Sequence, residues 1–136
     1  MGCDEVIILD TCAIIWDALK TDRLTTKAKH TMRAAEADNE LMISDISIWE
    51  IVMLVARKRL EIGETVSSFI NLYLQSRTIT VQPISSEIAE LSVSFGREIN
   101  NDPADRIIAA TTILTGAKLV TADDNLITSA IIPTVW

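Results

Sequence analysis

The sequence has little histidine, cysteine, positive charge or aromatic surface. Its 136 residues include one histidine and two cysteines, His30, Cys3 and Cys12. A zinc site of the usual tetrahedral kind needs more His and Cys ligands than these. The 12 Lys and Arg are outnumbered by 19 Asp and Glu, and there are three Trp, two Phe and one Tyr. A nonspecific coat on nucleic acid, which depends on cations and stacking aromatics, is therefore not expected.

Long hydrophobic runs are also missing. The most apolar segment, residues 46–56, is short and carries Glu50, whereas roughly 20 apolar residues are needed to span a bilayer. The N-terminus starts with acidic residues and leads directly into an apolar run, without the basic start and cleavage site of a signal peptide. We therefore expect a cytoplasmic protein without membrane contact, whose two cysteines are reduced thiols.

What remains is the composition of a globular chain. Hydrophobic residues make up 49% of the sequence, with only four Gly and three Pro, which does not fit disorder or a low-complexity polymer. The length suits one domain spanning residues 1–136. Short apolar runs typical of buried strands occupy residues 6–9, 41–43, 78–81, 118–120, and either 131–132 or 134–135.

Helical spacing of apolar residues separates these predicted strands. It covers residues 26–37, 47–59, 66–74, 88–95 and 102–116. Asp102 followed by Pro103 gives the last segment an N-cap and a proline at the first helical position. Strands that alternate with helices indicate an α/β fold with a mainly parallel sheet. In such sheets, ligands bind outside the carboxyl ends of the strands.

Acidic residues follow the predicted strands or open the helix before the fourth strand. They are Asp10, Asp102, Asp105, Asp123 and Asp124. Glu50 lies among apolar neighbours, where a carboxylate is costly to bury unless it is paired. Because the ends of parallel strands meet at one sheet edge, we expect four acids from separate segments to converge. These four are Asp10, Glu50, Asp105 and Asp123.

Taken singly, each acid is better explained as part of a helix cap. The capping-box or N-cap pattern fits three segments, Ser47 to Glu50, Asp102 to Asp105 and Thr121 to Asp124, and Asp10 is placed to cap a helix beginning near Thr11. The functional hypothesis depends on convergence. Carboxylates that lie close together repel one another unless protons or cations compensate their charge.

A cluster of carboxylates without nearby His or Cys suits Mg²⁺ or Mn²⁺. The usual task of these ions in such a site is phosphoryl transfer, in which they prepare a water for attack and stabilise charge on the phosphate. The sequence therefore predicts a phosphodiester hydrolase that uses a metal-activated water.

Four segments, in this order, resemble the acidic motifs of PIN-domain ribonucleases. They are Ile8-Leu9-Asp10-Thr11-Cys12, residues 44–50 with Trp49-Glu50, the sequence DPADRIIAAT at residues 102–111, and LVTAD at residues 119–123. The chain length and the last two segments are similar to those of VapC toxins from bacterial and archaeal toxin–antitoxin modules. The resemblance covers essentially the whole chain, and its strength lies in the ordered set of four.

The resemblance implies a three-layer PIN-like fold, with a central, mainly parallel sheet of four to five short strands flanked by helices. It also implies a Mg²⁺- or Mn²⁺-dependent endoribonuclease that forms a homodimer and is inhibited by a cognate antitoxin protein. By matching positions, the catalytic and metal-binding acids are Asp10, Glu50, Asp105 and Asp123, with Asp102 and Asp124 as extra ligands, and Thr11, Ser44 and Thr121 support the carboxylates.

Other residues receive mainly structural interpretations. We expect Arg106 to pair with the carboxylates beside it, and Cys12 and Trp49 to be buried in the core. As a hypothesis, the basic residues of segments 27–33 and 57–59 flank the acidic site and hold RNA phosphates. The second segment is better explained by the favourable interaction of cations with a helix C-terminus.

Two other functions compete with the nuclease. A phosphatase of the haloacid dehalogenase type uses an aspartyl nucleophile after the first strand, but it needs a second Asp two residues later, where Cys12 stands. The alternative from a non-enzymatic class is a PIN-like binding module whose acids hold a metal or a basic peptide without cleaving anything. The complete set of four acids favours the nuclease.

Overall fold

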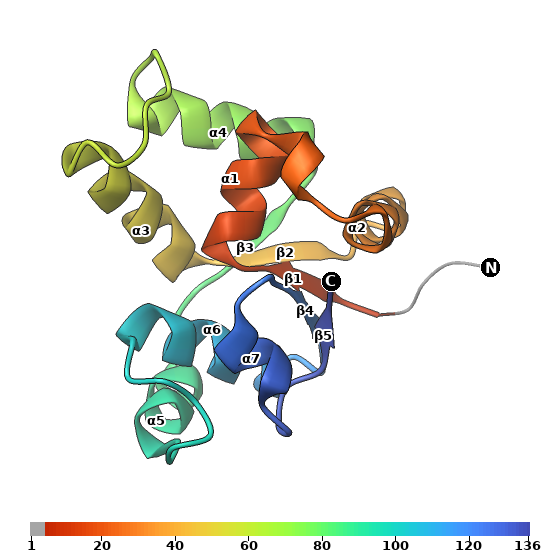
Figure 1. The fold of residues 1–136 in the computed structure, drawn as a ribbon, viewed down its shortest axis with the longest axis vertical. Coiled ribbons are helices and arrows are strands. Elements are labelled where there is room, and N and C mark those ends of the chain that lie inside the picture. The colour runs from red at the N-terminus through yellow and green to blue at the C-terminus, as the bar shows by residue number, and fades with distance from the viewer. Residues whose placement is uncertain (1–4) are drawn as a thin grey trace.

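A five-stranded parallel sheet forms the centre of the structure, a computed structural model that describes residues 5–136 (Figure 1). Its strands are β1 (Ile7–Leu9), β2 (Leu41–Ser44), β3 (Thr80–Gln82), β4 (Lys118–Val120) and β5 (Thr134–Val135). They lie in the order β3-β2-β1-β4-β5, and every neighbouring pair is parallel. The α/β fold with a parallel sheet is confirmed. Cys3, predicted to be a reduced thiol, lies outside the described residues.

Helices cover both faces of this sheet. They are α1 (Thr11–Leu19), α2 (Thr26–Ala37), α3 (Asp45–Ala56), α4 (Val66–Ser76), α5 (Ser86–Ser94), α6 (Pro103–Leu114) and α7 (Asp124–Thr128), with a short 3₁₀ helix, η1 (Thr21–Arg23). The first four helices lie on one side of the sheet and α5, α6 and α7 on the other (Figure 1). This is the three-layer arrangement that the resemblance implies.

The central strand, β1, is buried from both sides. Ile7 and Leu9 point into an apolar cluster shared with α1, α2, α3 and α4, while Ile8 belongs to a second cluster with α5, α6 and α7. All three side chains are at most 1% exposed. An unbroken apolar run is what a strand covered on both faces requires, and this rigid centre fixes the residue that follows it, Asp10.

Local capping signals decide where the helices begin. Asp102 caps α6 by accepting a hydrogen bond from the Asp105 amide at 3.1 Å, as predicted, and Pro103 follows it. α3 begins at Asp45, two residues before the predicted start, because Ser44 is its N-cap and accepts from the Ile46 amide at 3.2 Å. At the other end of α6, Gly116 adopts a φ of 66° that turns the chain into β4.

A partly buried polar contact joins α1 to the end of α4. The Asp17 carboxylate accepts a hydrogen bond from the Tyr73 hydroxyl at 2.7 Å and an ion-paired one from Arg77 Nε at 2.9 Å. This contact fixes the position of α1, the helix that carries one wall of the site described below. Within residues 5–136, no helix combines the length and apolar character needed to cross a membrane.

Candidate functional site

The four predicted acids line one cleft at the carboxyl edge of the sheet. Its walls come from the turn after β1, from α1, α3 and α6, and from the turn after β4. The lining residues are Asp10, Thr11, Cys12, Trp16, Glu50, Leu54, Asp105, Ala122 and Asp123. β1 lies between β2 and β4, so segments distant in sequence meet where these strands end. Asp102 and Asp124, considered above as extra ligands, are not among the residues that line the cleft.

Asp10 is the most buried acid of the cleft, only 6% exposed. One carboxylate oxygen caps α1 by accepting from the Ala13 amide at 2.8 Å, and the other accepts a short hydrogen bond from the Thr121 hydroxyl. Burial raises the pKa of Asp10 to about 6, with smaller contributions from Asp105 and Asp123, although both hydrogen bonds oppose the rise. The Asp10 carboxylate therefore caps α1 and lines the cleft at the same time.

Glu50 reaches the cleft from the interior of α3. The predicted capping box from Ser47 to Glu50 is wrong, because the helix begins at Asp45, two residues before Ser47, and Ser44 is its cap. The Glu50 carboxylate instead accepts a short hydrogen bond from the Thr11 hydroxyl, whose oxygen lies 3.0 Å from Ser47 Oγ. Burial is the main cause that raises the Glu50 pKa. Among neighbouring charges, the Asp102 carboxylate raises it most.

Asp105 is held by a residue that the sequence reasoning missed. The Asn100 side chain donates from Nδ2 to the Asp105 carboxylate at 2.9 Å. The backbone N–H of Asn100 donates to the side-chain oxygen of Asn125 at 3.0 Å. Burial raises the Asp105 pKa, and neighbouring Asp102 and Asp123 raise it further. A loop amide before the helix cap has no periodic signal, so only the folded chain reveals this support.

Asp123 and Thr121 connect the end of β4 to Asp10. The Asp123 carboxylate caps α7 by accepting from the Leu126 amide at 3.0 Å, and the Asp123 amide donates to the Thr121 hydroxyl at 3.0 Å. The Thr121 hydroxyl in turn donates to Asp10. The predicted capping box from Thr121 to Asp124 is wrong, since Asp123 is the cap and Asp124 begins the helix.

The predicted supporting residues divide into two groups. Thr11 and Thr121 hydrogen-bond Glu50 and Asp10 directly. Ser44 is fully buried and caps α3, and its recorded hydrogen bond is to the Ile46 amide. It therefore positions the helix that carries Glu50.

Arg106 does not pair with the carboxylates, contrary to expectation. Its guanidinium donates to the backbone carbonyl of Ser92, in the last turn of α5, and to those of Phe95, Gly96, Ile99 and Asn100, in the segment between α5 and α6, at 2.8–3.4 Å. These carbonyls lie at the end of a helix and in a loop, where helical partners are missing. Arg106 thus holds in place the loop that presents Asn100 to Asp105.

Two other expectations about burial are wrong. Cys12 is exposed and lines the cleft, so a thiol does lie near the acids. Desolvation by the cleft walls and the charges of the acids raise its pKa to about 11, which keeps it protonated near neutral pH. Trp49 is 57% exposed rather than buried in the core, whereas Ser47 and Ile51 are the buried residues of α3.

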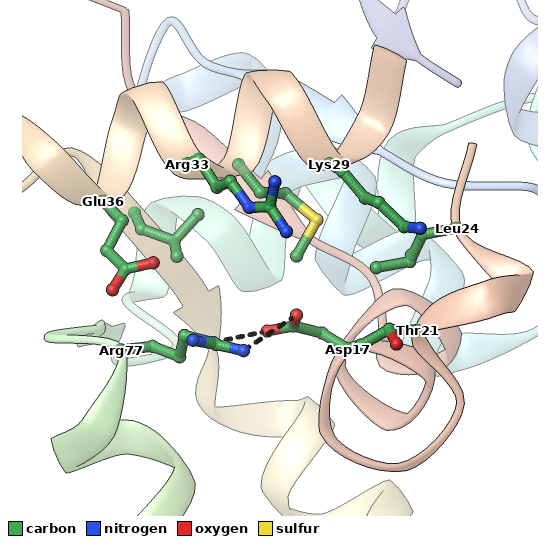
Figure 2. A pocket seen from close by; sticks show the side chains of 9 residues that line it. Asp17, Thr21, Leu24, Lys29, Arg33, Glu36 and Arg77 are labelled. Carbon is green, nitrogen blue, oxygen red and sulfur yellow. Dashed lines mark hydrogen bonds and ion pairs between the residues drawn. The ribbon is translucent and has the colours of Figure 1, made fainter. Parts of the chain in front are cut away.

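A second pocket, between α2 and the ends of α1 and α4, is lined by Lys29 and Arg33, two of the basic residues for which RNA binding is the hypothesis. Figure 2 shows Lys29 and Arg33 extending from α2 toward the ion pair of Asp17 and Arg77. None of the four acids lines this pocket. Lys29 and Arg33 therefore belong to a site separate from the acidic cleft.

The donor chemistry of the acidic cleft fits a hard divalent cation. Carboxylate oxygens are the preferred ligands of Mg²⁺ and Mn²⁺, and the elevated pKa values of Asp10, Glu50 and Asp105 include mutual repulsion, which a bound cation relieves. Across residues 5–136, no three His, Cys, Asp or Glu side chains are already grouped closely enough to count as a preformed metal site. The side chains that line the cleft would hold the ion by converging on it.

Comparison with known proteins gives consistent matches over most of the chain. The PIN domain family model matches residues 7–130. Ribonuclease VapC22 of Mycobacterium tuberculosis is 31% identical over 121 residues, which cover 88% of this chain and 88% of that protein.

Solved structures also resemble this chain over most of its length. A toxin–antitoxin complex from Klebsiella pneumoniae matches with a TM-score of 0.55 and 29% identity over 86% of each chain. VapBC2 from Rickettsia felis, bound to a DNA fragment from its promoter, matches with a TM-score of 0.71 and 17% identity over 95% of this chain and 96% of that one. FitAcB from Neisseria gonorrhoeae matches with a TM-score of 0.58 and 19% identity over the same shares. The last two matches, at lower identity, bear on the fold alone.

Proposed function

Because the chain belongs to the PIN-domain family, we propose that it is a metal-dependent endoribonuclease acting as the toxin of a toxin–antitoxin pair. The observation that carries this proposal is the meeting of Asp10, Glu50, Asp105 and Asp123 in one cleft. The similarity to Ribonuclease VapC22 supports RNA as the substrate. Phosphodiester hydrolysis is the reaction that such a cluster of carboxylates serves.

The four acids are the proposed ligands for Mg²⁺ or Mn²⁺. When bound, such an ion lowers the pKa of a water molecule and offsets negative charge on the phosphate. It also favours the ionised forms of the carboxylates whose pKa values are raised by burial and by neighbouring acids. Asp102 and Asp124 lie outside the cleft lining, and we give them no direct role.

The residues of this chain prepare the cleft before substrate arrives. Asp10 is fixed by Thr121 and the Ala13 amide, Glu50 by Thr11, and Asp105 by Asn100. Such supporting hydrogen bonds orient the carboxylates that receive the cation. The enzyme therefore loses little conformational freedom when the charged phosphate enters.

The partners of this enzyme follow from the same proposal. The similarity to a toxin–antitoxin complex from Klebsiella pneumoniae supports a cognate antitoxin as its inhibitor. Trp49, Val52 and Ile84, which are 57%, 41% and 39% exposed, form an apolar patch on and beside α3 that supports the proposed homodimer. We propose the cytoplasm, where cellular RNA is available as substrate, as the place where the protein acts.

Cleavage of total cellular RNA by the purified, antitoxin-free protein tests the function. The reaction is run with Mg²⁺, Mn²⁺ or EDTA, and in parallel with Asp10→Asn. We expect cuts at a limited set of sites that require the divalent ion and are lost in Asp10→Asn. Folded wild type that cuts no RNA with either ion would refute the ribonuclease and favour a non-catalytic binding module.

A further inference from the structure

One wall of the acidic cleft carries an aromatic side chain that the proposed chemistry does not use. Trp16 lies on α1, six residues after Asp10, and lines the cleft together with Leu54 of α3. Cys12, four residues earlier on α1, lies on the same side of the helix. Within the described part of the chain, Trp16 is the aromatic residue of this cleft.

Two other side chains lie against the Trp16 ring. Its centre lies 5.6 Å from that of the Trp136 ring, with the two planes inclined at 51°. The Arg23 guanidinium, from η1, lies over the Trp16 ring at 5.9 Å from its centre. The ring thus belongs to an assembly of three side chains, from α1, from the neighbouring η1 and from the distant residue Trp136, which limits its rotation. A rigid aromatic surface loses little conformational entropy when a ligand stacks on it.

The acids beside the Trp16 ring indicate which ligand the ring could bind. A phosphate placed among the acids brings its attached nucleosides against the adjoining cleft wall. The protein carries a formal charge of −7, so attraction to phosphates contributes less to RNA affinity than in a basic protein. Stacking of bases on aromatic rings is another source of RNA affinity, and it tolerates different base sequences. Arg23, exposed beside the ring, adds a cation near the same nucleotide.

We propose that Trp16, supported by Trp136 and Arg23, is a nucleobase-stacking platform that seats one unpaired base next to the phosphodiester to be cut. The inference rests on the proposed ribonuclease function and extends it to a substrate-binding residue. An unpaired base is required, because a base within a helix has both faces occupied by its neighbours. The platform thus favours cleavage in loops and single strands.

Removal of single bases from the substrate tests the platform. An RNA oligonucleotide that contains a mapped cut site is prepared with one abasic nucleotide at each position around the cut. For wild type in Mg²⁺, we expect one abasic position to lower kcat/KM by about 5- to 100-fold, the range of one base–aromatic stack. An equal rate at every abasic position would overturn the proposal without any variant.

The same scan with variants distinguishes stacking from mere packing. Trp16→Leu keeps apolar volume but has no aromatic face, so we expect slower cleavage of the intact RNA and no further loss at the sensitive abasic position. Trp16→Phe should retain that sensitivity, and Leu72→Ala, an exposed change on α4 outside the cleft, should match wild type. If folded Trp16→Leu keeps the full abasic penalty, the platform is refuted while the ribonuclease stands. If wild type cuts no RNA, both proposals fall.

Discussion

At the residue scale, hydroxyl and amide groups determine how the acids of the cleft are held. Thr121 and Thr11 each bind a carboxylate from a different segment, and Asn100 binds a third. The two threonine hydroxyls join segments far apart in the sequence, whereas Asn100 lies five residues before the acid that it holds. Removing one of them should change the orientation of a carboxylate while leaving the fold in place.

Thr11 offers the clearest test of such support. Thr11→Val removes the hydroxyl that donates to Glu50 but nearly preserves the volume of the side chain. We expect cleavage to fall by roughly 10- to 100-fold, the usual cost of losing a supporting hydrogen bond at a metal site. Thr11→Ser, which keeps the hydroxyl, is the matched control and should stay within a few-fold of wild type. Equal rates for Val and Ser variants would show that the bond does not matter.

Asp10 predicts an unusual pH dependence of stability. Its pKa is about 6 in the folded protein against 3.8 for an ordinary Asp, so the folded state binds this proton more tightly than the unfolded state does. Without divalent ions, the wild type therefore loses stability as the pH rises from about 4 through 6. Asp10→Asn removes this loss and should be more stable at pH 8, by about 1–3 kcal/mol.

Urea unfolding followed across the pH range measures the difference directly. The gap in unfolding free energy between Asp10→Asn and wild type should widen from pH 4 to pH 7 and then level off. A gap that narrows as the pH rises would show that the ionised Asp10 stabilises the fold, the reverse of our expectation.

At the element scale, one arginine anchors the loop between α5 and α6. Arg106 donates to five backbone carbonyls of Ser92, Phe95, Gly96, Ile99 and Asn100. This loop also delivers the side chain that holds Asp105. The stability of the loop and the arrangement of the cleft are therefore linked through a residue that does not line the cleft.

Replacing this arginine should lower both stability and activity. Arg106→Met keeps much of the side-chain length but leaves the carbonyls without donors, which should cost about 2–4 kcal/mol of unfolding free energy. Cleavage measured well below the melting temperature should also fall, because Asn100 loses its fixed position. The neighbouring, exposed Arg97 provides the control, and Arg97→Met should change neither quantity. A stable Arg106→Met variant would refute the anchoring role.

How well the sequence predicted the elements depended on the kind of signal each one carried. β4 and α2 match the predicted ranges because apolar periodicity and burial agree there, and α6 was found from the Asp102–Pro103 start. α3 was predicted to begin too late, since Ser47 mimics a cap while Ser44 is the true one.

The lining of the cleft was predicted only where an acid followed a strand or opened a helix. Asp10, Glu50, Asp105 and Asp123 all line it, because the order of parallel strands brings their segments together. Asn100, Trp16 and the loop contacts of Arg106 are determined by contacts between segments, which no local pattern in one sequence records.

At the scale of the whole molecule, the sheet order explains why four separate segments build one cleft. β1 lies in the middle, β2 and β4 are its neighbours, and all three point the same way. The acids that follow these strands, or lie on the adjoining helices, thereby reach the same edge. The repulsion between them is a cost of folding that the proposed cation would offset.

A divalent ion should consequently stabilise the whole fold. Ligands that bind only the folded state raise its stability by mass action, so saturating Mn²⁺ should raise the melting temperature by several degrees at pH 7.5, and EDTA should reverse the change. In Asp10→Asn the increase should be less than half as large. Thermal unfolding followed by circular dichroism provides the measurement, and an equal increase in both proteins would place the ion elsewhere.

The most direct test of the central claim compares, in one RNA cleavage assay, an acid that lines the cleft with an acid that lies outside it. Asp105 lines the cleft, whereas Asp124 is exposed and does not. With Mg²⁺ and a defined RNA under single-turnover conditions, we expect Asp105→Asn to cut at least about 100-fold more slowly than wild type. Asp124→Asn should stay within about threefold of wild type. Wild-type rates in folded Asp105→Asn would contradict the account, because the reaction would then take place outside this cleft.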